Sequence, residues 1–253
     1  MQAKSTLEDA LALMRDLRAR CEWDRAQTHA SLRPYLIEET HELDDALRSG
    51  DVDAIREELG DVLLQVLFHS VLAEEEGAFD AHDVAGGLIE KMKRRHPHLY
   101  GGGPKERWET MKARSRGSLT EGLPSGLPAL HRAQRLQDRA AGVGFDWPDV
   151  EGPALKVEEE LAEVREQLAR EASPQARDAL ENELGDLLFA VVNLCRRANV
   201  HAAVALDRAN EKFVRRFEAM EALAAERHVT LSSLAASQLD DLWNEVKRVE
   251  PNH

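Results

Sequence analysis

The segment Glu58-Leu-Gly-Asp-Val-Leu-Leu-Gln-Val66 recurs later in the chain as Glu183-Leu-Gly-Asp-Leu-Leu-Phe-Ala-Val191. Both copies lie in stretches dominated by alanine, leucine, glutamate and arginine, which favour helices. A long, ordered recurrence of this kind indicates that one structural unit occurs twice in the chain. The segment therefore predicts two related helical units in tandem.

Other elements repeat in the same order around this segment. They are Glu38-Glu39-Thr-His-Glu42 with Glu159-Glu160-Leu-Ala-Glu163, Glu90-Lys91 and Arg94-Arg95 with Glu211-Lys212 and Arg215-Arg216, and Trp108 and Lys112 with Trp243 and Lys247. The order is kept while the spacing between elements varies, as expected when loops change and helices do not. The pattern favours a tandem duplication.

Helix start and stop signals punctuate the chain, and alternating strand patterns are nearly absent. We predict that Ser31 caps a helix to about Arg48, that Asp51 caps one to about Glu76, and that Asp80 opens a third that ends before Pro97. Pro153 suits a first helical turn, and Ser173-Pro174 reads as a cap followed by the first helical position. The sequence therefore predicts an all-α protein.

The middle of the chain is rich in residues that break helices. Six of the nine prolines and nine of the fifteen glycines fall between Pro97 and Pro153. We therefore expect an N-terminal repeat over residues 1–116, a linker with a connecting helix over 117–145, and a C-terminal repeat over 146–253.

Composition excludes several classes of protein. The 253 residues carry 33 Lys and Arg against 47 Asp and Glu, a net charge of −14, which argues against a nucleic-acid-coating protein. No apolar run is long enough to cross a membrane, and the N-terminus lacks the apolar core of a secretory signal. Two cysteines are too few for a disulfide framework. We expect a cytoplasmic protein with no nucleic-acid or membrane partner.

The recurring acids have a spacing that places them together. Residues three apart share one face of a helix. The pairs are Glu39 with Glu42 and Glu58 with Asp61 in the first repeat, and Glu160 with Glu163 and Glu183 with Asp186 in the second. If the two helices of each repeat pack antiparallel, four carboxylates converge.

Such a convergence needs a hard cation to offset the repulsion between the charges. Ligands that are all oxygen favour Mg²⁺, with Mn²⁺ as an alternative, over zinc. The competing interpretation is a solvated helix face with ordinary ion pairs.

The basic elements suggest a second chemistry. Lys212 and Arg216 share a helix face, and two cations opposite a metal-bound carboxylate cluster would suit a polyphosphate. Taken alone, such a pair of cations more often forms part of a solvated surface, and an isolated tryptophan such as Trp243 is more often a core residue. No Gly-x-x-x-x-Gly-Lys-Ser/Thr loop is present, so a P-loop enzyme is excluded.

Several further motifs carry a family resemblance. They are Cys21-Glu22-Trp23-Asp24, Arg94-Arg95-His96-Pro97-His98, Gly144-Phe145-Asp146-Trp147 and Asn210-Glu211-Lys212-Phe213. With the paired acidic elements, they closely resemble the two-domain MazG nucleoside triphosphate pyrophosphohydrolases over nearly the whole chain. Glu22 departs from the family, which commonly has proline after the cysteine.

The resemblance implies an all-α fold completed by dimerisation and Mg²⁺-dependent cleavage of nucleoside triphosphates between the α and β phosphates. The implied metal ligands are Glu160, Glu163, Glu183 and Asp186, matching the acids found from spacing. The implied substrate contacts are Lys212, Arg216, Trp243 and Lys247. The family also implies that the C-terminal repeat is catalytic.

Two asparagines distinguish the repeats. Asn193 and Asn210 stand where the first repeat has Phe68 and Ile89. They are candidates for reading the nucleotide, although a satisfied core amide is an equal alternative for each.

The expected mechanism is metal-assisted attack of water on the α-phosphorus, with Glu159 orienting the water. Lys212, Arg216 and Lys247 would hold the charge of the leaving pyrophosphate. The alternative function is a nucleotide-sensing or dimerisation module with the same fold. The sequence does not select a base.

Overall fold

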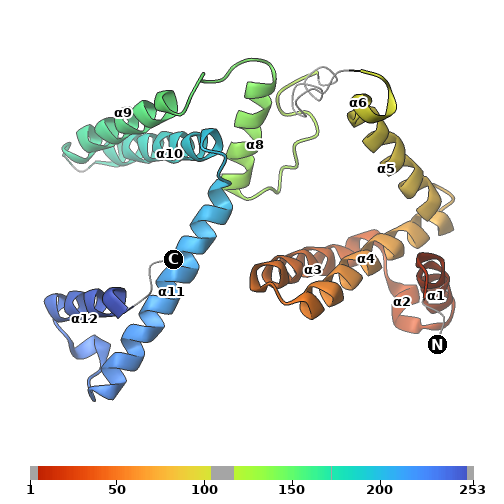
Figure 1. Ribbon diagram of the computed structural model, residues 1–253, viewed down its shortest axis with the longest axis horizontal. Helices are drawn as coiled ribbons and strands as arrows, with labels where there is room; N and C mark the ends of the chain where they lie inside the picture. Colours follow the sequence, from red (N-terminus) through yellow and green to blue (C-terminus); the bar gives the residue numbers. More distant parts are fainter. Residues whose placement is uncertain (1–4, 104–116, 172, 250–253) are drawn as a thin grey trace. The chain divides into compact units, whose positions relative to one another are not determined.

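In the computed structural model, which describes residues 5–103, 117–171 and 173–249, every regular element is helical (Figure 1). The chain divides into two compact units, Met1–Lys105 and Glu106–His253. The predicted all-α class is therefore confirmed over these ranges. Trp108 and Lys112, part of the predicted repeat, lie outside the described residues.

The first unit contains α1 (Leu7–Arg20), α2 (Glu22–Ala26), α3 (His29–Ser49), α4 (Val52–Glu75), α5 (Ala81–Arg95) and α6 (Pro97–Tyr100). Helices α3 and α4 lie side by side and form its most extensive helix pair. A core of leucine, methionine, phenylalanine and valine side chains joins α1, α3 and α4. Phe68, only 1% exposed, is the largest side chain in this core.

The second unit contains α8 (Ala129–Gly142), α9 (Glu151–Leu168), α10 (Pro174–Arg197), α11 (Ala202–Glu226), a short 3₁₀ turn (Leu231–Ser233) and α12 (Ala236–Val249). Helices α9 and α10 repeat the pairing of α3 with α4. Helix α8 packs against α10 and α11, and Nε2 of Gln137 donates to the Phe189 carbonyl at 2.8 Å. Helix α12 packs on the C-terminal half of α11, around Met220 and Ala224.

Most of the predicted helix boundaries are confirmed. Asp51 and Asp80 cap α4 and α5 with their carboxylates, and Ser173 caps α10 with Pro174 in its first turn. Gly50 ends α3 in the left-handed conformation, with a φ of 72°. These caps satisfy backbone groups that a helix end leaves without partners.

One predicted cap is wrong. Helix α3 begins three residues earlier than expected, because Thr28 and not Ser31 is its cap. The Thr28 hydroxyl accepts from the Ser31 amide at 3.2 Å, and the Ser31 hydroxyl accepts from the Thr28 amide at 2.9 Å. This reciprocal capping box places Ser31 inside the first turn.

No helix in the described ranges has both the length and the apolar character needed to cross a bilayer. Cys21 and Cys195 are both free thiols.

Candidate active site

Three carboxylates of the second unit meet between α9 and α10. Glu160 on α9 and Glu183 and Asp186 on α10 each offer a carboxylate oxygen, and these oxygens lie within 4.8 Å of one another. Antiparallel packing of two helices brings the pairs face to face, because residues three apart project on one side of a helix. The geometry therefore supplies three oxygen ligands of the kind that hard divalent cations bind.

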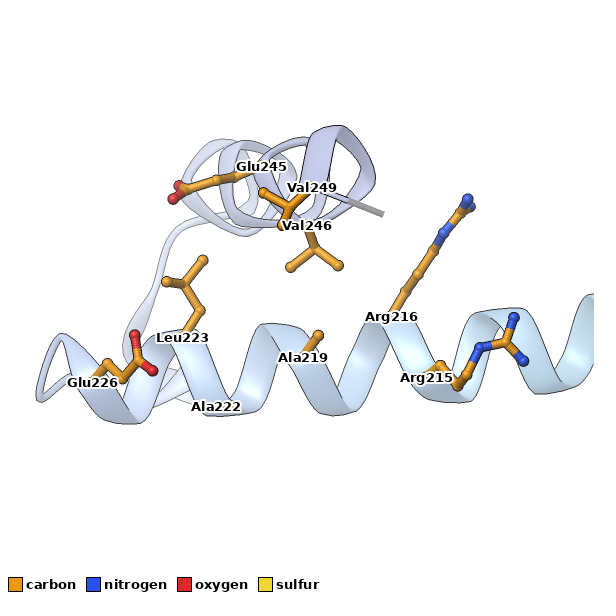
Figure 2. Close-up of a pocket in the computed structure, with 9 residues that line it drawn as sticks. All are labelled: Arg215, Arg216, Ala219, Ala222, Leu223, Glu226, Glu245, Val246 and Val249. Carbon is orange, nitrogen blue, oxygen red and sulfur yellow. The ribbon is translucent and has the colours of Figure 1, made fainter. Parts of the chain in front are cut away.

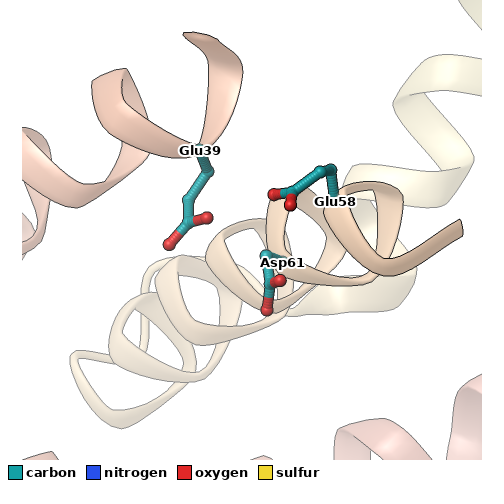
Figure 3. Close-up of side chains that lie close together, drawn as sticks. All are labelled: Glu39, Glu58 and Asp61. Atoms are coloured by element: carbon teal, nitrogen blue, oxygen red, sulfur yellow. The ribbon is translucent and has the colours of Figure 1, made fainter. Parts of the chain in front are cut away.

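The first unit contains the equivalent group. Glu39 on α3 faces Glu58 and Asp61 on α4, again with oxygens within 4.8 Å of one another (Figure 3). Burial and the neighbouring Asp61, Glu42 and Glu58 charges raise the pKa of Glu39. Like charges held this close disfavour one another's ionisation, which is the condition that a bound cation relieves.

The fourth predicted acid of each repeat lies at the edge of its group. Neither Glu42 nor Glu163 contributes an oxygen to the three that meet in its repeat. Each is nevertheless close enough for charge interactions with the acids of its group. Burial and the Glu160 carboxylate raise the pKa of Glu163, while Lys156 opposes this shift. The structure thus brings together three of the four acids predicted for each repeat and places the fourth beside them.

Glu160 is the most buried member, with an exposed fraction of 5%. Its Oε1 accepts from Lys156 Nζ at 2.7 Å, whereas its Oε2 is buried without a hydrogen-bond partner among the described residues. A buried carboxylate oxygen with no partner is energetically costly. An unpartnered oxygen in this position is consistent with a group that binds a divalent cation.

Lys156 was not predicted from the sequence, although its position contained the signal. It lies four residues before Glu160 and three before Glu159, so all three can meet along one side of α9. Nζ of Lys156 also contacts Glu159 Oε1, at 2.9 Å. Hydrogen bonds to Glu160 and then Glu159 raise the pKa of Lys156. The first repeat has Tyr35 at this position and no equivalent cation.

The predicted substrate residues of α11 and α12 form a separate group. The Arg216 guanidinium lies 5.9 Å from the centre of the Trp243 ring, and Phe213 lies 5.5 Å from the same ring. Lys212 and Lys247 are exposed on these two helices. The α11–α12 hairpin therefore gathers a cationic and aromatic surface on a different pair of helices from the carboxylates.

A pocket of about 480 Å³ opens between α11 and α12 next to this surface (Figure 2). Its walls combine apolar side chains with charged groups, and Arg216 extends toward the side on which α12 lies. Leu223 and Val246 line the apolar part. Glu160, Glu183 and Asp186 do not line this pocket.

The two asparagines differ in their surroundings. Asn210 is exposed on α11. Asn193 is half-buried on α10, where its Oδ1 accepts from Arg196 Nε at 3.0 Å and from the terminal Nη2 at 2.9 Å. Sequence reasoning did not identify this contact with Arg196.

Comparison with known proteins agrees with this geometry. The model of the MazG nucleotide pyrophosphohydrolase domain matches residues 27–100 and 152–220, which contain the two carboxylate groups. The nucleoside triphosphate pyrophosphohydrolase/pyrophosphatase MazG of Thermotoga maritima is 44% identical over 97% of both chains. The nucleoside triphosphate pyrophosphohydrolase of Escherichia coli K12 is 42% identical over 94% of both chains. The chain belongs to the MazG nucleotide pyrophosphohydrolase family.

Proposed function

We propose that this protein hydrolyses nucleoside triphosphates to monophosphate and pyrophosphate in a reaction that depends on a divalent metal. The observation that carries the proposal is the Glu160, Glu183 and Asp186 group, with its buried Glu160 oxygen that lacks a partner, in a chain of this family. The two relatives named above have the same activity in their names.

The residues fit a hard divalent cation. All the donors are carboxylate oxygens, so Mg²⁺ is the preferred ion and Mn²⁺ an alternative. Glu160, Glu183 and Asp186 would hold it, with Glu163 completing the set. When bound, the ion would supply Lewis-acid stabilisation of charge on the phosphates.

The other proposed roles belong to side chains of the chain itself. Lys212, Arg216 and Lys247 bind the departing pyrophosphate, and their charges offset the charge that develops on it as the bond to the α-phosphorus breaks. Trp243 offers a ring face beside Arg216. Asn193 and Asn210 contact the nucleoside.

Glu159 is proposed to orient the attacking water. Its carboxylate bonds to Lys156, so this role requires it to leave that lysine. Adjacent helical residues project about 100° apart, so Glu159 and Glu160 reach the Lys156 amine from different directions. Substitution of Glu159 by Gln tests the role, because it keeps a hydrogen-bonding group while removing the base.

We propose that the first repeat binds metal but supports less catalysis than the second. It has the carboxylate group but has Phe68 and Ile89 in place of the two asparagines. We therefore assign the catalytic role to the second repeat.

A homodimer is proposed to complete the active site. Helix α10 exposes Leu184, Leu188, Phe189 and Val191 by 38–60%, and α11 exposes Leu206, Phe213, Val214 and Phe217 by 39–56%. Apolar faces this extensive mark association surfaces. Gly185, in the middle of α10, has open space around it within one chain, which leaves room for another helix or a ligand to approach. Helix α10 also carries Glu183 and Asp186, and α11 carries Lys212 and Arg216, so a second copy that covers these faces would lie beside both groups.

The direct test is product analysis with each ribonucleoside and deoxyribonucleoside triphosphate. With Mg²⁺ we expect monophosphate and pyrophosphate in equal amounts, and with a chelator we expect neither. Diphosphate with orthophosphate would refute attack at the α-phosphorus. Tight binding with no product would favour the sensing module.

A further inference from the structure

The side-chain amide of Asn193 has a defined orientation. Arginine has only hydrogen-bond donors, so the atom that accepts from Nε and Nη2 of Arg196 must be the amide oxygen. The amide nitrogen therefore points to the other side. Among the described residues, no protein acceptor is bonded to it.

Arg196 is itself held by a second partner. Its two terminal nitrogens bond to both oxygens of Asp146, in the loop before α9, with Nη1 to Oδ2 at 3.3 Å. The side chains of Arg196 and Asp146 are only 11% and 15% exposed. Burial alone would raise the pKa of Asp146, but the bonds to Arg196 keep it below its usual value. An arginine–carboxylate pair that is joined by two hydrogen bonds and shielded from solvent holds the guanidinium plane in one orientation.

The next residue, Arg197, also anchors this loop. Arg197 bonds to the carbonyl of Pro148 at 2.9 Å and that of Asp149 at 3.3 Å, and lies 3.4 Å from Asp146 Oδ2. None of these three contacts involves Asn193. Arg196 and Arg197 thus share a loop, but only Arg196 reaches the amide.

Asn193 lies on the face of α10 that carries the metal ligands. It follows Asp186 by seven residues, so it lies about two turns, or about 10 Å, further along the same face. The fold of the repeat does not require a side-chain amide at this position. The first repeat has Phe68 at this position, 1% exposed, and Val71, 2% exposed, at the position of Arg196.

We propose that Arg196 and Asp146 are positioning residues that fix Asn193 as a hydrogen-bond donor to the base of the bound nucleotide. A fixed donor complements a carbonyl group and opposes an exocyclic amino group. The site therefore prefers bases with an oxo group at this edge, such as uracil, over their amino counterparts, such as cytosine. This inference rests on the nucleotide binding that the proposed function requires.

The test measures binding of the non-hydrolysable α,β-imido analogues of UTP and CTP, with Mg²⁺, by calorimetry. We expect the wild-type protein to bind the UTP analogue roughly tenfold more tightly, as one mismatched buried hydrogen bond would require. N193D keeps an oxygen for Arg196 and replaces the donor with an acceptor. It should reverse the preference, and the ratio of the two affinities removes the general effect of the added charge.

The positioning role is tested with D146N and D146E, and with R197Q as the matched control. D146N should reduce the preference toward unity, D146E should restore part of it, and R197Q should retain it although it loosens the same loop. Circular dichroism checks that each variant keeps its helices. An unchanged preference in N193D, or an equal loss in R197Q and D146N, would overturn the proposal.

Turnover separates this inference from the proposed function. If the analogues are discriminated but the wild-type protein releases no pyrophosphate from any nucleoside triphosphate, the proposed function fails and the inference stands. If pyrophosphate is released but the two analogues bind equally, the inference fails alone. Binding of neither analogue refutes the inference.

Discussion

Lys156 Nζ lies 2.7 Å from one oxygen of Glu160, while the other oxygen of the same carboxylate is buried without a partner among the described residues. Lys156 thus bonds to one oxygen of the most buried carboxylate in the group that Glu160 forms with Glu183 and Asp186. A lysine and a cation compete for the same negative charge, so Lys156 is expected to oppose the proposed metal binding at Glu160.

Replacement of Lys156 by Met should therefore change stability and metal affinity in opposite directions. Without metal, we expect a loss of about 1–2 kcal/mol, less than for a fully buried pair, because Lys156 is 40% exposed. Apparent Mg²⁺ affinity should rise, since the competing cation is gone. Urea unfolding and Mg²⁺ titration measure the two effects. Unchanged metal affinity would show that Lys156 does not compete.

Substitution of one proposed metal ligand in each repeat should show which repeat is catalytic. E183Q should lower Mg²⁺-dependent turnover by about a thousandfold, as expected from losing several kcal/mol of transition-state stabilisation. E58Q, the matched change in the first repeat, should leave most of the activity. Steady-state pyrophosphate release measures both. If E183Q remains fully active when E58Q is also present, the metal site is misassigned.

The first carboxylate group should make stability depend on pH and metal. Folding raises the pKa of Glu39 above its ordinary value of 4.5, so the protonated side chain favours the folded state. This stabilisation is fully present below pH 4.5 and is lost as the pH rises through the higher pKa of the folded state. At neutral pH without metal, E39Q should therefore melt slightly higher than wild type, by about 1 °C, because solvent screens the group.

The difference in melting temperature should vanish below pH 4, where both chains are uncharged at this position. Mg²⁺ should then stabilise wild type more than E39Q. Thermal melts at pH 3.5 and 7.5, with Mg²⁺ or a chelator, provide the readout. Equal Mg²⁺ stabilisation of both proteins would contradict a cation site in this repeat.

The exposed apolar face of α10 should be an association surface. Leu188, 60% exposed, is its most exposed member, and L188E should weaken the proposed dimer at least about tenfold by burying an unpaired charge. L168E is the control, since Leu168 is 64% exposed at the end of α9. Sedimentation equilibrium gives the dissociation constants. A dimer equally strong in L188E and wild type would exclude this face.

Much of the site was predictable from local spacing. The repeated Glu-Leu-Gly-Asp segments predict one helix in each unit, and the three-residue intervals place Glu58 with Asp61 and Glu183 with Asp186 on one face. The caps at Asp51, Asp80 and Ser173 were predictable for the same reason, since a cap acts within three residues. Thr28 was missed because Thr28 and Ser31, three residues apart, are both residue types that cap helices.

The sequence by itself determined that the chain is helical, duplicated and supplied with paired carboxylates, because those properties depend on residues a few positions apart. Only the tertiary structure decided that Glu42 and Glu163 lie at the edge of their groups, that Glu160 is buried, and that Asp146 reaches Arg196 across 50 residues. These contacts depend on how each helix is rotated against its neighbour, and burial of apolar side chains across the whole unit sets that rotation.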